Sequence, residues 1–310
     1  MRRLDLICIN LADFWLKKNA VNHLIIYFAM GFGTQLHASS MKSEFSKTWA
    51  ETTFYSNKLP KSTIQYALLG PDTLKNGLWV EWYENGAKKF ESPWENGKKS
   101  GKEIWFYVNG KTKTEWNFKE GKRNGILKEW DANGVLTLQS QFVDDLQDGL
   151  TTTNYSNSKS KYKGLWKSGK RNGLQQWWYE NGKKKAESEW SDGLMQGKEI
   201  IWGDNGAKQF EFLYKYGKRD GLAIYFYPNG KKAREENWVQ GKLNGATTSW
   251  DPQGKLMAVI EFVNDQKQGT ETIYFPNRQR KAEHSFLSGR VTPGSEKKWD
   301  SLGVPLNHQP

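Results

Sequence analysis

One glycine recurs at a fixed interval of 24 residues along most of this chain. The series is Gly77, Gly101, Gly125, Gly149, Gly173, Gly197, Gly221, Gly245 and Gly269. A fixed period of this length is typical of repeat architectures, in which each unit contacts only its neighbours. The 310-residue chain therefore does not need one large hydrophobic core.

Each repeat, numbered from its opening glycine as position 0, has the pattern of a β-hairpin. Positions 8 and 9 are Asn and Gly in most copies, as in Asn85-Gly86 and Asn181-Gly182. Asn-Gly between two half-apolar runs favours a hairpin, because both residues tolerate a positive φ. We predict strands over positions 1–6 and 11–18, joined by a three-residue loop at positions 7–9. The fold class is then all-β: an elongated, single-sheet antiparallel meander of tandem 24-residue β-hairpin repeats, with roughly 18 to 20 strands.

Aromatic residues recur at positions 5 and 17 of the repeats. Side chains alternate between the two faces of a strand, and a three-residue loop keeps the odd positions of both strands together. We therefore predict one apolar, aromatic face and one charged face, with Lys and Glu of positions 12 and 14 on the second. The structural aromatic rows are Trp82, Trp94, Phe118, Trp130, Phe142, Trp166, Trp178, Trp190, Tyr214, Trp238, Phe262 and Phe286.

The second turn of the repeat has its own motif, an aromatic residue followed by x-x-Gly-Lys-x-x-Gly. It reads W-K-S-G-K-R-N-G at Trp166–Gly173 and Y-K-Y-G-K-R-D-G at Tyr214–Gly221. Joined to aromatic-x-x-Asn-Gly, it resembles the MORN repeat family in its bacterial variant form, over about residues 77–303. The chain lacks the extra Gly-x-Gly of many eukaryotic copies. The resemblance implies an elongated run of β-hairpins that binds proteins or phospholipids, and bacterial members are described as antitoxin-like.

The segments outside the repeats suggest a division of the chain. Lys17 and Lys18 precede the apolar run Leu24–Gly33, which is too short to span a bilayer, and Ala38 is a small residue where cleavage would occur. We predict a signal peptide or leader at 1–38, with a buried amphipathic element as the alternative. Residues 39–76 are then a linker and degenerate N-terminal cap, 77–292 nine repeats, and 293–310 a partial tenth repeat and C-terminal cap.

The charge and the second turns indicate candidate binding residues. The net charge of +12 is typical of chains that bind anionic partners, although it also favours solubility. Basic pairs in equivalent turns would form a stripe along one edge. Three aromatic residues at position 4 would project on the charged face, where they could stack on a ligand. The candidates are Lys122, Arg123, Lys170, Arg171, Lys218, Arg219, Trp105, Trp177 and Tyr225.

Nothing in the sequence predicts catalysis or metal binding. Cys8 is the only cysteine, and His284 is the only histidine within the repeats. The carboxylate pairs Asp144-Asp145 and Glu235-Glu236 are interpreted as turn and strand residues rather than as a catalytic dyad. We expect no enzyme activity, no cofactor, no metal site and no small-molecule substrate.

The function predicted from the sequence is that of a non-enzymatic binding or scaffold module. Its partner is expected to be a protein, an anionic membrane or a cell-wall polymer; nucleic acid is not expected, and the chain is expected to be a monomer. The alternatives are an intracellular, antitoxin-like protein inhibitor and a glycan or cell-wall binder that uses aromatic rungs. With a signal peptide the protein is exported to the periplasm or bacterial envelope; without one it is cytoplasmic.

Overall fold

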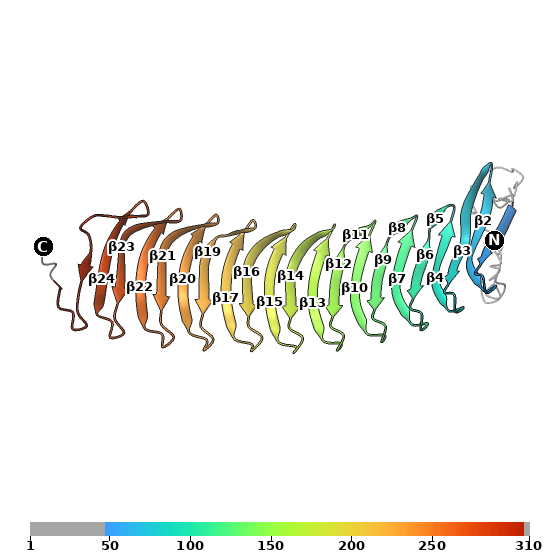
Figure 1. The fold of residues 1–310 in the computed structure, drawn as a ribbon. Coiled ribbons are helices and arrows are strands. Elements are labelled where there is room, and N and C mark those ends of the chain that lie inside the picture. The colour runs from blue at the N-terminus through green and yellow to red at the C-terminus, as the bar shows by residue number, and fades with distance from the viewer. Residues whose placement is uncertain (1–46, 307–310) are drawn as a thin grey trace, which may run out of the picture.

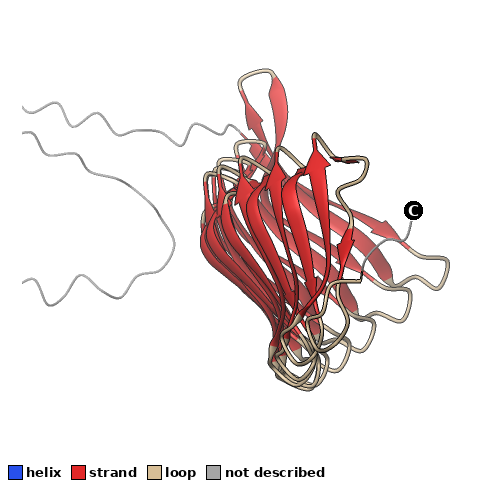
Figure 2. Cartoon of the chain, turned by 90° about the vertical axis from the view of Figure 1, so that its left-hand side faces the viewer, coloured by secondary structure: helices blue, strands red, loops and turns tan. Residues whose placement is uncertain are grey.

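A computed structural model of the protein describes residues 47–306, and the predicted leader and Cys8 lie outside them. These residues form one sheet of 26 strands, a succession of antiparallel hairpins (Figure 1). The all-β, single-sheet meander predicted from the sequence is confirmed, and Figure 2 shows strands and loops with no second layer over the sheet.

The strands follow the chain order from one end of the sheet to the other. They are β1 (Lys47–Phe54), β2 (Pro60–Leu69), β3 (Asp72–Trp82), β4 (Lys88–Glu95), β5 (Lys98–Lys99), β6 (Gly101–Phe106), β7 (Thr112–Lys119), β8 (Lys122–Arg123), β9 (Gly125–Trp130), β10 (Leu136–Val143), β11 (Leu146–Gln147), β12 (Gly149–Asn154), β13 (Ser160–Lys167), β14 (Lys170–Trp178), β15 (Lys184–Ser191), β16 (Leu194–Trp202), β17 (Lys208–Lys215), β18 (Lys218–Arg219), β19 (Gly221–Phe226), β20 (Lys232–Val239), β21 (Lys242–Trp250), β22 (Leu256–Val263), β23 (Gln266–Tyr274), β24 (Arg280–Leu287), β25 (Arg290–Val291) and β26 (Lys297–Lys298). The count exceeds the predicted 18 to 20 partly because an irregularity before the position-0 glycine separates short strands such as β5 and β8 from β6 and β9.

The three-residue loop predicted at positions 7–9 is confirmed. In the first repeat the Tyr83 amide donates to the Ala87 carbonyl at 2.8 Å, and the Gly86 amide donates to the Tyr83 carbonyl at 2.9 Å. Gly86 has a φ of 82°, in the left-handed region that glycine adopts without a steric penalty. The turn at positions 19 and 20 is a two-residue turn with both φ values positive, as at Glu120 (51°) and Gly121 (84°).

The prediction that odd positions of both strands share a face is wrong. Every hairpin contains a β-bulge next to its loop, in addition to the irregularity before the position-0 glycine. In the first repeat Trp82 pairs with Lys88, but Glu81 pairs with Phe90, so one extra residue is inserted between them. Beyond this β-bulge, even positions of the first strand lie opposite odd positions of the second. The same shift recurs in the hairpins β6–β7, β14–β15 and β19–β20.

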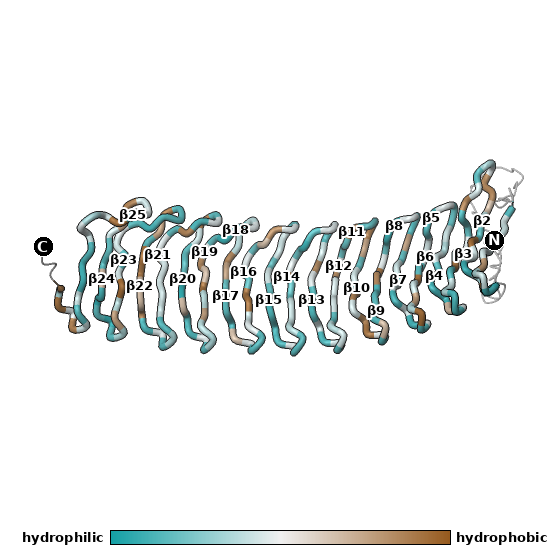
Figure 3. The backbone as a smooth tube through the Cα atoms, in the orientation of Figure 1, coloured by the Kyte–Doolittle hydropathy of each residue, from teal (hydrophilic) through white to brown (hydrophobic). Residues whose placement is uncertain are grey.

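The bulge divides the predicted aromatic rows between two faces. Position 17 shares a face with positions 2, 4, 13, 15 and 22, as the contact of Trp79 with Trp94 shows (ring centroids 6.2 Å apart). Position 5 lies on the other face, where Lys184 sits over Trp202 and also pairs with Glu187. We call these the aromatic face and the ion-pair face. The tube in Figure 3 accordingly shows hydrophobic residues interspersed with hydrophilic ones along each strand.

Side chains in and beside the loops at positions 7–9, which we call the lower turns, bond each repeat to the next. Tyr179 Oη donates to the Trp202 carbonyl at 2.9 Å, and Asn181 Nδ2 donates to the Asp204 carbonyl at 2.9 Å. Asn181 Oδ1 also accepts from the Lys183 amide, which closes its own turn. Asparagine therefore recurs at position 8 because one side chain satisfies two turns.

The two ends of the described chain contain modified repeats. Within the segment predicted as a linker and cap, β1 and β2 form a hairpin whose Tyr55 and Asn57 bond to the Trp82 and Glu84 carbonyls, as their equivalents do elsewhere. At the other end β26 pairs with β24, and Asp300 Oδ1 accepts from the Leu302 and Val304 amides.

Candidate binding face

The aromatic face has a row of rings along the sheet, with cations between several of them. Rings of position 17 follow one another once per repeat, and the side chain of position 22 lies between them. The nitrogen of Lys99 is 4.7 Å from the Phe118 ring centroid, and the guanidinium carbon of Arg171 is 4.9 Å from that of Trp190. Further members are Arg123 over Phe142, Arg219 over Trp238 and Lys267 over Phe286. Cation–π attraction is strongest where water is partly excluded, so these half-buried contacts stabilise the row.

The predicted basic stripe is two rows rather than one. Lys122, Lys170 and Lys218 are exposed on the turn edge, whereas the arginine that follows each of them is half-buried on the aromatic face. Consecutive residues of a strand point to opposite faces, so an adjacent basic pair cannot act as one patch. The sequence signal that could have separated them is position 22 itself, which alternates with the rings.

The three arginines differ in their partners. Asp145 Oδ1 accepts from the Arg123 backbone amide and from Arg123 Nε, each at 3.0 Å, and the amide bond first and the side-chain bond second hold the pKa of the Asp145 carboxyl below its usual range. Arg219 Nη1 donates to Tyr225 Oη at 3.4 Å. Within residues 47–306, neither Arg171 nor Arg219 forms an ion pair with a carboxylate, in contrast to Arg123. Rings surround both guanidinium groups, and Arg219 reaches the Glu236 carboxylate only through the Tyr225 hydroxyl.

The position-4 aromatic residues lie on the aromatic face, which corrects the prediction that they project on the charged face. Trp105 packs on Phe90 with centroids 4.4 Å apart, and Trp177 packs on Tyr162 at 5.4 Å. Tyr225 packs on Phe210 at 5.7 Å. They form a second, shorter series of rings, and Trp105 is still 36% exposed.

Between the two series of rings lies a column of buried residues that the sequence reasoning missed. Ser92, Ser140 and Ser188 at position 15 are at most 1% exposed, as is Gln175 at position 2. Their polar groups are satisfied: Ser92 donates to Glu103, and Ser188 accepts from Trp190 Nε1 at 2.7 Å. The recurrence of a small or polar residue at position 15 of several repeats is the sequence signal that could have indicated this buried column.

Burial changes the ionisation of several groups on this face. It raises the pKa of the Glu199 carboxyl, which a bond from Tyr214 and the charge of Arg219 counteract. It also raises the pKa of the Tyr162 and Tyr225 hydroxyls. At the N-terminal end, burial and then the charge of Lys99 lower the pKa of the Lys75 ammonium, whose nitrogen is 3.7 Å from the Trp79 ring centroid.

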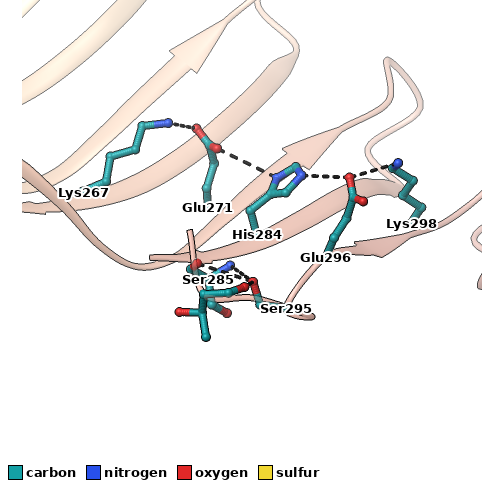
Figure 4. Close-up of polar contacts among 8 residues, drawn as sticks. Lys267, Glu271, His284, Ser285, Ser295, Glu296 and Lys298 are labelled. Atoms are coloured by element: carbon teal, nitrogen blue, oxygen red, sulfur yellow. Dashed lines mark hydrogen bonds and ion pairs between the residues drawn. The ribbon is translucent and has the colours of Figure 1, made fainter. Parts of the chain in front are cut away.

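A cluster of charged side chains around His284 lies at the C-terminal end of the aromatic face (Figure 4). His284 Nε2 lies 3.2 Å from Glu296 Oε1, and Nδ1 lies 4.0 Å from Glu271 Oε2. Lys267 pairs with Glu271 at 2.6 Å, and Lys298 pairs with Glu296 at 2.9 Å. The cluster connects β23 and β24 to the segment that carries β26, so it fastens the last strand to the array.

The ion-pair face is dominated by Lys–Glu pairs. Lys88 and Lys184 at position 11 bond Glu91 and Glu187 at position 14, with Nζ–Oε2 distances of 2.7 and 2.6 Å. A row of exposed aliphatic side chains at position 1 interrupts the charges; it includes Leu78, Ile126, Leu150, Leu174 and Leu222. Because water screens exposed ion pairs of this kind, they contribute little to the stability of the fold.

Among the described residues, no group of three or more His, Cys, Asp or Glu side chains is arranged to hold a metal ion, and no helix is long and apolar enough to cross a membrane. In each of the two carboxylate pairs interpreted from the sequence as structural, one carboxylate bonds an arginine side chain. Asp145 bonds Arg123, and Glu236 pairs with Arg234 at 2.9 Å while accepting from Trp238 Nε1 at 3.0 Å.

Comparison with known proteins identifies the repeat. Three segments match the MORN repeat variant family, at residues 75–96, 171–192 and 219–240. No curated protein matches the chain. Two crystal structures show weak likeness: TcdB2-TccC3-Cdc42 (13% identity, TM-score 0.18) and TcdB2-TccC3 without its hypervariable C-terminal region (14%, 0.17). The match covers 83% of this chain but only 15% of each of those chains, and at these scores it carries no argument.

The three matched segments share one frame with the other repeats of the array. Each begins just after a turn at positions 19 and 20, continues through the first strand and the lower turn, and ends after the second strand of the hairpin. Repeats of this family generally serve as binding or scaffold modules. Three repeats of the chain therefore match the MORN repeat variant family.

Proposed function

We propose that this protein is a non-enzymatic scaffold that binds a protein partner along its aromatic face. The observation that carries the proposal is the row of rings, with cations between several of them, on a sheet over which the described residues place no second layer. Tryptophan, tyrosine and arginine dominate the binding energy of protein interfaces, because each combines a large apolar area with a polar group. Here they are half-exposed and held in place by neighbours in the sheet.

The test is affinity capture from an extract of the host with immobilised protein. One variant, Trp105→Ala with Trp177→Ala, changes the aromatic face. The matched control, Leu150→Ala with Leu174→Ala, removes side chains that are 38% and 42% exposed on the opposite face. We expect a partner retained by the wild type and the control and lost on the aromatic-face variant. A partner retained equally by all three proteins would show that this face does not bind it.

A second candidate function is binding to an extended anionic surface through the turn-edge lysines. Lys122, Lys170 and Lys218 are exposed, and among the described residues none of them pairs with a carboxylate. They recur two repeats apart, about 19 Å, beyond the Debye length of about 8 Å at physiological salt. Each therefore acts nearly independently, and an anionic membrane or cell-wall polymer gains by multivalency.

Co-sedimentation separates this candidate from the first. Lys122→Gln, Lys170→Gln and Lys218→Gln together should abolish salt-sensitive binding to vesicles of acidic phospholipid or to anionic cell-wall polymer. They should leave capture of the protein partner intact. If the wild type sediments with neither at low salt, the lysines only solvate the edge.

The proposal includes export to the bacterial envelope, which the segment Leu24–Gly33 motivates. Export predicts a mature chain that begins near Ser39 and contains no cysteine. N-terminal sequencing of the protein made by its host is the measurement. A thiol-reactive probe that labels Cys8 in the purified native protein would rule out cleavage of the leader.

A further inference from the structure

The aromatic face has a period that a bound polymer can match. Trp166, Trp190, Tyr214 and Trp238 occupy position 17 of successive repeats. Each repeat advances the sheet by two strands, about 9.6 Å. A ligand lying along the sheet therefore meets an equivalent ring at each advance of this length.

The face also has two cations at twice that period. Arg171 is held among Trp166, Trp177 and Trp190, with its guanidinium carbon 5.8, 5.8 and 4.9 Å from their centroids. Arg219 lies 4.0 Å from the Phe212 centroid and 5.1 Å from that of Trp238. Neither pairs with a carboxylate of the described chain. Rings hold both guanidinium groups in place, which lowers the ordering cost of binding an acidic group.

Among regular polypeptide conformations, polyproline II fits this period best. It has three residues per turn and rises 3.1 Å per residue, so the same side of the chain recurs every 9.3 Å or so. A β-strand presents the same side about every 6.8 Å. An α-helix does so about every 10.5 Å, at each seventh residue. Over four repeats the polyproline II segment slips by about 1.2 Å and the helix by about 3.6 Å.

Resting on the proposed binding of a protein partner, we propose that the partner segment is an acidic, proline-rich polyproline II stretch that lies along the aromatic face. Its prolines pack against the rings of position 17, as prolines do in aromatic-lined recognition sites. Carboxylates six residues apart, about 19 Å, meet Arg171 and Arg219. Because the segment is already extended before binding, little conformational entropy is lost.

The probes are two fluorescent peptides of identical composition. The matched peptide consists of Pro-Pro-x units in which x is Gln or Glu, and each peptide contains two glutamates. In the matched peptide the glutamates are six residues apart; in the mismatched peptide one is exchanged with a proline, which places them four residues apart, about 12 Å. We expect fluorescence anisotropy to give a Kd at least fivefold lower for the matched peptide.

Protein variants test the two arginines. Arg171→Gln with Arg219→Gln should raise the Kd for the matched peptide at least tenfold and remove its advantage. The control, Lys170→Gln with Lys218→Gln, makes the same charge change one residue earlier on the exposed edge, and should change the Kd less than threefold. Should the arginine variant melt earlier than the wild type, Arg171→Lys with Arg219→Lys retains the charge and should restore most of the affinity.

Three outcomes overturn the inference. One is equal affinity for the two peptides, and another is equal loss in the two variants. The third is binding of an acidic helical peptide, but of neither proline-rich one. If the third occurs while capture of the host partner still depends on Trp105 and Trp177, the aromatic face binds a protein of different conformation and the proposed function stands. If capture is also indifferent to Trp105 and Trp177, both proposals are wrong.

Discussion

At the scale of single residues, the aromatic side chains of position 17 act as structural and surface groups at once. Trp190 shows both roles: its indole N–H donates to the buried Ser188, while Arg171 packs on its ring. In a single-layer sheet a residue is covered only by neighbours on its own face. Each large side chain therefore matters to the repeats on either side of it.

Trp190→Ala should lower the free energy of unfolding by about 2–4 kcal/mol, near the lower part of the range for a buried aromatic residue because this ring is only half-buried. It leaves Ser188 without its donor and Arg171 without one of its rings. Urea denaturation followed by circular dichroism measures the change. Trp190→Phe, which retains the ring, should recover more than half of the loss; if it recovers none, the indole N–H rather than the ring provides the stability.

The half-buried carboxyl of Glu199 makes stability depend on pH. Its pKa in the folded protein is raised above the unfolded value, chiefly by burial, so the folded state binds the proton more tightly. Stability from this group is therefore present below the unfolded pKa and is lost as the pH rises through the folded pKa. Glu199→Gln should raise the melting temperature at pH 7 and flatten its decline above about pH 4.5. An unchanged pH profile would show that Tyr214 and Arg219 fully compensate for burial.

At the scale of the hairpin, two local devices define each repeat: the bulge that reverses the alternation of side chains, and the glycine at position 0. Gly221 has a φ of 112°, and a Cβ there would lie 3.0 Å from Leu213 Cδ1. Gly230, in the loop, has a φ of 83° with nothing near the Cβ site. Position 0 therefore requires glycine both for its positive φ and for lack of space for a Cβ, whereas the loop position requires it only for its positive φ.

Gly221→Ala should be more destabilising than Gly230→Ala. The loop variant adds only left-handed strain, about 1–2 kcal/mol. The position-0 variant adds that strain and displaces Leu213, at a further cost of about 1–3 kcal/mol. Chemical denaturation of the two variants side by side gives the comparison. Equal losses would mean that Leu213 moves aside at no cost.

The asparagine of position 8 makes a testable link between hairpins. Asn181→Ala removes the bond to the Lys183 amide within its turn and the bond to the Asp204 carbonyl of the next. We expect a loss of about 1–2 kcal/mol, because both turns are exposed and water replaces part of each bond. Hydrogen exchange should quicken at Lys183 and in the following loop. Faster exchange at Lys183 alone would show that the link between repeats contributes nothing.

At the scale of the whole molecule, the array is one layer thick and lengthens with every repeat (Figure 1). Its two sides have different uses. The aromatic face concentrates rings and includes Arg171 and Arg219, which form no ion pair within the described residues; the opposite face consists mostly of ion pairs, and the turn edge exposes lysines. A partner that binds along the array contacts equivalent residues of several repeats, so its affinity grows with the number of repeats it spans.

Small-angle scattering measures this shape directly. A compact chain of 310 residues has a radius of gyration of about 19 Å. We expect a clearly larger value and a distance distribution with the long tail of a rod. A value near that of a compact globule would contradict the open meander in solution.

The amino-acid sequence by itself determined the features that depend on a few neighbouring residues. The 24-residue period, the three-residue loop at Asn-Gly and the alternation within each strand are local, since they follow from which residues tolerate positive φ and from the pleat. Matching them nine times was enough to predict a single-sheet meander of hairpins. The aromatic residues of position 17 were likewise predicted as a continuous row.

Only the tertiary structure decided which face each side chain occupies. The bulge between positions 4 and 5 has no residue signature, because it arises from the pairing of two strands, and it moves Trp105, Trp177 and Tyr225 to the aromatic face. The separation of Lys170 from Arg171, by contrast, follows from the alternation of side chains within one strand. One inserted residue reverses the alternation of every later side chain in a strand, so faces depend on register, and register is a property of the paired strands.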